Sequence, residues 1–146
     1  MSHLTQKQIL EAHIQAVLKK GKLHQNGPQA MAILVRAILQ ARHYQAKPYY
    51  HFARKLKNRR SYGVGRATGR KDQRLLRWYV FAEAHRAWKL LTPKKPTMPR
   101  RHGLPTPFMR YLEDLLLPEH FVRLLDNWQE YKQFYRACQA GIPFCP

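Results

Sequence analysis

The chain has 146 residues and a formal net charge of +19, because 27 Lys and Arg outnumber 8 Asp and Glu. A hydrophobic content of 45%, with 12% aromatic residues, argues against general disorder. The longest uninterrupted apolar run, residues 30–35, is far too short to cross a bilayer, so we expect no transmembrane span.

The charge is unevenly distributed along the chain. Residues 1–112 hold 24 of the 27 Lys and Arg but only three acids, which gives +21, whereas the last 34 residues carry a net charge of −2. We expect the acidic tail to belong to a different surface. Self-repulsion destabilises a strongly basic fold on its own, so an acidic partner is expected. Nucleic acid, phospholipid and an acidic protein all fit this expectation.

The periodicity of apolar residues predicts an all-α fold. Apolar residues recur at spacings of three and four, and no alternation is long enough for a strand. The first helix is expected over about 6–20, with Thr5 and Gln8 forming a capping box and Gly21 ending the helix. Its expected apolar face consists of Ile9, Leu10, Ile14, Val17 and Leu18.

Three further helical stretches are expected before residue 92. The second helix should begin at Pro28 and end near His43, and another stretch should start at Pro48 and break at the glycines 63, 65 and 69. Asp72 is predicted as the N-cap of a helix that ends near Leu91. Residues 1–91 thus read as a basic helical bundle, with an additional N-terminal helix before a core at about 28–91.

A proline-rich strap and C-terminal helices follow the bundle. Five prolines between residues 93 and 107 indicate an extended strap over 92–107, and residues 108–146 form a helical appendage. Pro107 and Pro118 can each begin a helix, the second running over about 119–140. That second helix has an aromatic seam that fits either this chain's core or docking on another subunit, and we predict docking. The predicted docking residues are Phe121, Leu124, Trp128, Tyr131 and Tyr135.

Several kinds of chemistry lack a pattern in the sequence. The glycine segment 63–69 lacks the Gly-Lys-Ser/Thr ending of a phosphate-binding P-loop, and no predicted strand precedes it. The eight histidines show no HExxH arrangement, so no metal site is expected. Cys138 and Cys145 are read as free thiols by default, with a terminal disulfide as the alternative. No catalytic residues can be nominated, and we expect a non-enzymatic protein.

A dense basic stretch occupies residues 54–77, with ten Lys or Arg and one acid, Asp72. Such a run is often only a solvated face. Like charges three or four residues apart on a helix repel one another, which favours a compensating partner. Nucleic acid would act as that partner through counterion release, although the sequence has no RNP, KH or zinc-finger pattern.

The spacing of residues 34–91 resembles the LYR-motif family of small mitochondrial three-helix proteins. The segment Leu34-Val35-Arg36 stands at the position of the Leu-Tyr-Arg motif, with valine in place of tyrosine. Tyr50 follows within the aromatic and basic segment 49–57, Tyr62 falls where the family has phenylalanine, and residues 72–91 supply the third helix. The strap and the tail are also loosely similar to the extended tail of a family member in respiratory complex I.

The resemblance implies a non-catalytic subunit of a mitochondrial membrane complex, with respiratory complex I as the leading candidate. It implies a peripheral place on the matrix side of the inner membrane, among neighbouring subunits. The implied partner is the acidic mitochondrial acyl carrier protein, which presents an acyl-phosphopantetheine, and no cofactor is bound covalently. The residues expected to bind the carrier are Arg36, Tyr50, Arg54, Lys55, Lys57, Arg59 and Arg60. The residues expected to line the acyl slot are Leu34, Ile38, Leu76, Val80 and Ala84.

The alternative function is a nucleic-acid-binding protein, such as a mitochondrial ribosomal subunit, that uses the basic face for RNA phosphates. One structural feature discriminates the two hypotheses. Acyl-carrier binding predicts an open slot between the helices, whereas RNA binding leaves that space filled by the protein's own side chains and produces a steep salt dependence.

Overall fold

The computed structural model describes residues 4–45, 69–97, 104–119 and 128–141, and every regular element in these ranges is a helix. The elements are α1 (Gln6–Lys20), α2 (Gly27–Gln45), α4 (Gly69–Leu91), α5 (Pro107–Leu116) and α6 (Trp128–Gln139). The predicted all-α class is therefore confirmed. The helical stretch expected after Pro48 lies outside the described residues.

Local sequence signals determine where α1 and α5 begin. The Thr5 backbone N–H donates to Gln8 Oε1 at 2.8 Å, and the Gln8 N–H donates to Thr5 Oγ1 at 3.1 Å, which completes the predicted capping box. Pro107 opens α5 as predicted, because its fixed φ suits the first helical turn. The Thr106 hydroxyl caps α5 by accepting from the Met109 N–H.

Two predicted details are wrong. The predicted N-cap Asp72 lies inside α4, which already includes Gly69. Ile9, predicted for the apolar face of α1, is 55% exposed, whereas Leu10 is buried one position later. Of the helix expected over about 119–140, residues 128–139 are helical as α6, whereas Glu119 is not helical and residues 120–127 lie outside the described residues.

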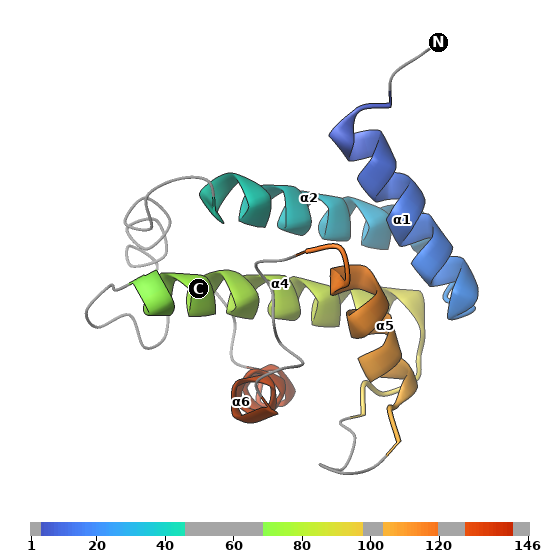
Figure 1. The fold of residues 1–146 in the computed structure, drawn as a ribbon. Coiled ribbons are helices and arrows are strands. Elements are labelled where there is room, and N and C mark those ends of the chain that lie inside the picture. The colour runs from blue at the N-terminus through green and yellow to red at the C-terminus, as the bar shows by residue number, and fades with distance from the viewer. Residues whose placement is uncertain (1–3, 46–68, 98–103, 120–127, 142–146) are drawn as a thin grey trace.

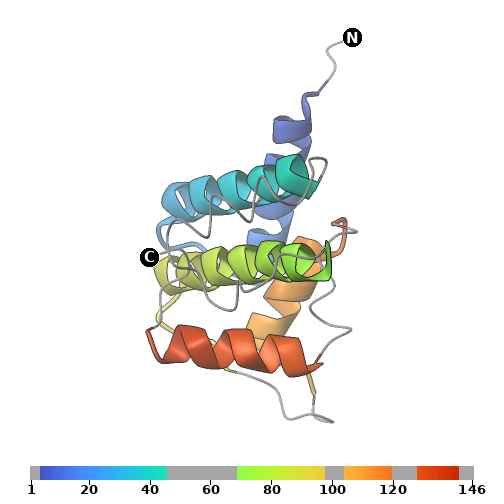
Figure 2. The ribbon, with the colours of Figure 1, turned by 90° about the vertical axis from the view of Figure 1, so that its left-hand side faces the viewer.

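The helices form layers around α4. In Figure 1, α2 and α4 lie across the view one above the other, and α6 is seen nearly end-on below α4. Figure 2 shows α6 lengthwise in the lowest of three layers, below α4. The helix α4 packs on α2, α5 and α6, and α1 packs on α2 and α5. This arrangement places α4 at the centre of the described fold.

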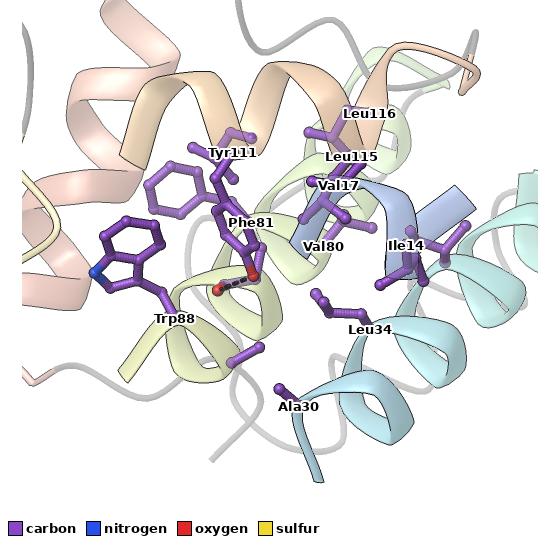
Figure 3. Close-up of a cluster of buried hydrophobic side chains, with 14 of the residues drawn as sticks. Ile14, Val17, Ala30, Leu34, Val80, Phe81, Trp88, Tyr111, Leu115 and Leu116 are labelled. Atoms are coloured by element: carbon purple, nitrogen blue, oxygen red, sulfur yellow. Dashed lines mark hydrogen bonds between the residues drawn. The ribbon is translucent and has the colours of Figure 1, made fainter. Parts of the chain in front are cut away.

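One hydrophobic core is shared by all five helices, and part of it is shown in Figure 3. Its aromatic centre is Phe81 of α4, whose ring packs edge-on against Phe108 of α5 and Tyr131 of α6. The ring centroids lie 6.1 Å and 5.4 Å apart, respectively. The C-terminal helices that the sequence places in an appendage thus contribute to the same core as the N-terminal helices.

Candidate anion-binding site

Acidic side chains of the tail form buried ion pairs with the basic part of the chain. Arg42 of α2 donates from Nε to Glu119 Oε1 and from Nη2 to Glu119 Oε2, both at 2.7 Å. The Glu119 side chain is only 2% exposed. The hydrogen bonds to this carboxylate raise the pKa of Arg42, so the guanidinium stays protonated, and the contact is bidentate.

A second pair of the same kind fastens α6 to α4. Arg77 donates from Nε to Glu130 Oε1, and its Nη2 donates to Glu130 Oε2 at 2.8 Å. Both side chains are largely buried, with 18% and 7% exposure. Buried ion pairs require good geometry to offset the loss of hydration, and the two-point contact supplies it.

Two further pairs are more exposed. Lys20 Nζ of α1 lies 3.3 Å from Asp114 Oδ2 of α5, and Arg86 pairs with Glu83 within α4 at 2.6 Å. Three acids of the tail therefore face cations of α1, α2 and α4. The expectation that the acidic tail forms a separate surface is wrong, because Glu119 and Glu130 are buried in ion pairs with α2 and α4, and Asp114 pairs with α1 at the surface.

A pocket of about 520 Å³ is lined by the end of α1, the end of α4 with the residues after it, and α5. Val17, Leu23 and Trp88 form part of its apolar wall, and Pro107 and Tyr111 of α5 extend it. This volume falls in the range typical of small-ligand sites.

The charged residues of this pocket come from three separate segments. Lys20 ends α1, Lys94 follows α4, and Arg110 lies in the first turns of α5, which also provides Glu113 and Asp114. Lys20 is paired with Asp114. Within the described ranges, Lys94 and Arg110 are exposed and neither takes part in an ion pair. Two cations are thus left to face an anion.

Hydrogen bonds fix the walls of the pocket. Trp88 Nε1 donates to the Lys94 carbonyl oxygen at 2.8 Å, and the Lys94 N–H donates to Thr92 Oγ1 at 3.2 Å. The Tyr111 hydroxyl donates to the Ala84 carbonyl oxygen at 3.0 Å, as the dashed line in Figure 3 shows. These bonds satisfy the polar atoms of both aromatic residues, so their positions do not depend on a ligand.

Burial also shifts the pKa values of His85 and Cys138. Burial lowers the pKa of His85 to about 4, with a smaller contribution from Lys89, so the ring is neutral at physiological pH. Burial raises the pKa of the Cys138 thiol to about 12, which disfavours the reactive thiolate. Cys138 is a free thiol, whereas Cys145 lies outside the described residues.

The predicted LYR-type residues are only partly described. Leu34 and Val35 are buried and Arg36 is exposed on α2. The other residues expected to bind the carrier lie outside the described ranges: Tyr50, Arg54, Lys55, Lys57, Arg59 and Arg60.

The five residues expected to line the acyl slot lie together at the interface of α2 and α4. They are covered by neighbouring side chains of the core. Each of them is at most 2% exposed, and all belong to the shared core: Leu34, Ile38, Leu76, Val80 and Ala84. Their apolar character reflects core packing, and the pocket described above is lined by other residues.

The predicted docking seam also packs within this chain where it is described. Tyr131 is fully buried against Phe81, and the Tyr135 hydroxyl donates to the Pro96 carbonyl oxygen at 2.7 Å. Tyr131 thus belongs to the core of this chain, and docking of the seam on another subunit stays a prediction. Trp128 begins α6, and Phe121 and Leu124 lie outside the described residues.

Sequence reasoning missed the pocket because its residues are spread over segments 17–23, 88–94 and 107–114. Each of these segments reads as ordinary helix or strap. The one local signal was the basic end of α1 followed, far along the chain, by basic residues in the strap.

Some kinds of site are absent from the described ranges. No helix there combines the length and apolar composition that a membrane crossing requires. No three His, Cys, Asp or Glu side chains of that part of the chain come together as a metal-binding group.

Comparisons with protein-family models, with curated proteins and with solved structures give no match to the chain.

Proposed function

We propose that the protein is a non-catalytic nucleic-acid-binding protein whose exposed Lys and Arg side chains contact phosphates. The observation that carries this proposal is the engagement of three tail acids in ion pairs, two of which are buried. Glu119 and Glu130 are buried against Arg42 and Arg77, and Asp114 is paired with Lys20. With these acids engaged, the outer surface of a chain of net charge +19 presents mainly cations.

The closed core supports the same proposal. An acyl chain needs an apolar slot, and the residues expected to form one are at most 2% exposed. A nucleic-acid-binding protein needs no such slot, because phosphate contacts form on the surface and derive much of their free energy from counterion release.

Binding of an acidic acyl carrier protein is a second proposal, supported by one observation. Arg36 is exposed on α2 next to buried Leu34 and Val35, as the LYR resemblance implies. Charge would attract the carrier as readily as it attracts nucleic acid. Accommodating the acyl chain would require α2 and α4 to separate, which exposes packed core surface.

Affinity purification separates the two proposals. The tagged protein is recovered from its native cells, divided in two, and washed at moderate salt with or without nuclease. We expect nucleic acid in the untreated half and loss of most partners after nuclease. Retention of an acidic protein bearing an acylated phosphopantetheine after nuclease treatment would replace the first proposal with the second.

A further inference from the structure

The pocket at the junction of α1, α4 and α5 has an ordered arrangement of charge. On α5, Arg110 precedes Glu113 and Asp114 by one helical turn, so all three lie on the same side of the helix. Lys94 contributes a second cation from the strap after α4. The unpaired cations therefore suit an anionic group, while Glu113 suits a hydrogen-bond donor about one turn away.

The remaining lining is mostly apolar. Val17, Leu23 and Pro107 contribute aliphatic surface, and Trp88 and Tyr111 complete the wall. A ligand that fits must combine an anionic group, an apolar or planar body, and a donor. A nucleotide of adenine, guanine or cytosine has all three in its phosphate, its base and the exocyclic amine of that base.

We propose that this pocket holds one nucleotide of a bound single strand, with the phosphate on Arg110 and Lys94 and the base toward the apolar wall. The inference rests on the proposed nucleic-acid binding and names one place where the strand meets the protein. It also predicts a preference for single strands, because a base in a duplex must be unstacked and unpaired before it can enter a pocket.

The pocket is formed before the ligand arrives. Its wall is fixed by the hydrogen bond from Trp88 Nε1 to the Lys94 carbonyl oxygen, and its rim by the ion pair of Lys20 with Asp114. A preformed site loses less conformational freedom on binding than a site that must be ordered. Arg110 and Lys94 are themselves exposed, so they can be replaced without opening the core.

The test compares two variants of the full-length protein that lose the same charge. The pocket variant is Lys94→Gln with Arg110→Gln. The control is Lys132→Gln with Arg136→Gln, on α6 and outside the lining of the pocket. Fluorescence anisotropy with a labelled single-stranded DNA of mixed sequence gives the affinities, and the same sequence as a duplex is measured in parallel.

We expect the pocket variant to bind the single strand about tenfold more weakly than the wild type, and the control only about twofold more weakly. The wild type should prefer the single strand to the duplex, and the pocket variant should lose most of that preference. If both variants weaken binding equally and the strand preference does not change, the pocket does not hold a nucleotide, although the protein still binds nucleic acid. Absence of binding by the wild type to either DNA would overturn the proposed function itself.

A third variant tests the donor end of the pocket. Glu113→Gln should weaken binding of oligo-dA, whose base carries an exocyclic amine, and leave oligo-dT unchanged. An equal change for both homopolymers would assign Glu113 a general electrostatic effect and contradict its role next to the base.

Discussion

Two interfaces of the fold are held together differently. One joins α2 to α4, and the other joins these two helices to the C-terminal segment. The first is apolar, with Leu34, Ile38 and Leu76 fully packed. The second combines aromatic packing with the bidentate pairs Arg42–Glu119 and Arg77–Glu130. Hydrophobic burial is non-directional, whereas a two-point ion pair requires a definite geometry. The tail is therefore positioned by charge as well as by packing, and the pairing of Glu119 and Glu130 leaves the surface basic.

Leu76→Ala tests the apolar interface and has the largest expected effect. Leu76 has no exposed surface, so its truncation should leave a cavity and lower the free energy of unfolding by about 3 to 4 kcal/mol. Chemical denaturation measures the change. The matched control is Ile9→Ala, which truncates a side chain that is 55% exposed and should cost under about 1 kcal/mol. Similar stabilities of the two variants would indicate that Leu76 lines an open slot.

Arg42→Met tests the ion-paired junction. It leaves the Glu119 carboxylate buried without its partner and should lower the free energy of unfolding by about 3 kcal/mol. The comparison variant is Lys20→Met, whose pair with Asp114 is more exposed and should contribute under about 1 kcal/mol. Thermal unfolding of both variants gives the ranking. If Arg42→Met is no more destabilising than Lys20→Met, the tail is held by apolar packing alone.

His85 gives the fold a dependence on pH. Its folded pKa of about 4 lies below the ordinary 6.5, so the unfolded chain binds more protons between these values. The contribution of the neutral His85 ring to the free energy of unfolding is therefore complete above about pH 6.5 and is lost as the pH falls toward 4. The wild type should therefore lose free energy of unfolding between pH 6.5 and pH 4, and we expect His85→Gln to reduce this loss by about 2 kcal/mol.

Denaturation of the wild type and His85→Gln at several pH values measures this loss. His24→Gln, which changes an exposed histidine, serves as the control and should keep the wild-type loss. Equal losses for all three proteins would show that His85 is not the group responsible.

The positions of the helices could be predicted from the sequence better than the packing of one helix against another. Thr5, Gln8 and Pro107 act within a few residues of their own positions, so local signals were enough to place the starts of α1 and α5. The same kind of signal could not tell which apolar face meets which. The spacing of Leu34, Ile38, Leu76, Val80 and Ala84 is the same for a packed core and for a ligand slot, and only the burial of these residues in the structure separates the two.

Long-range charge pairing was also beyond the reach of the sequence. Glu119 is separated from Arg42 by 77 positions and Glu130 from Arg77 by 53, so no periodicity connects them. Composition could show that the tail is acidic but not that Glu119 and Glu130 are buried. The pocket depends likewise on three segments brought together by folding, and none of them has a motif of its own.

Contacts between exposed cations and phosphates require that binding of nucleic acid depend steeply on salt, because each contact releases counterions. The affinity of the wild type for one single-stranded oligonucleotide is measured at several salt concentrations. We expect log K to fall linearly with log salt, with a slope of about −3 or steeper, which corresponds to at least four phosphate contacts. A slope near zero, or no measurable binding at low salt, would contradict the proposed phosphate contacts.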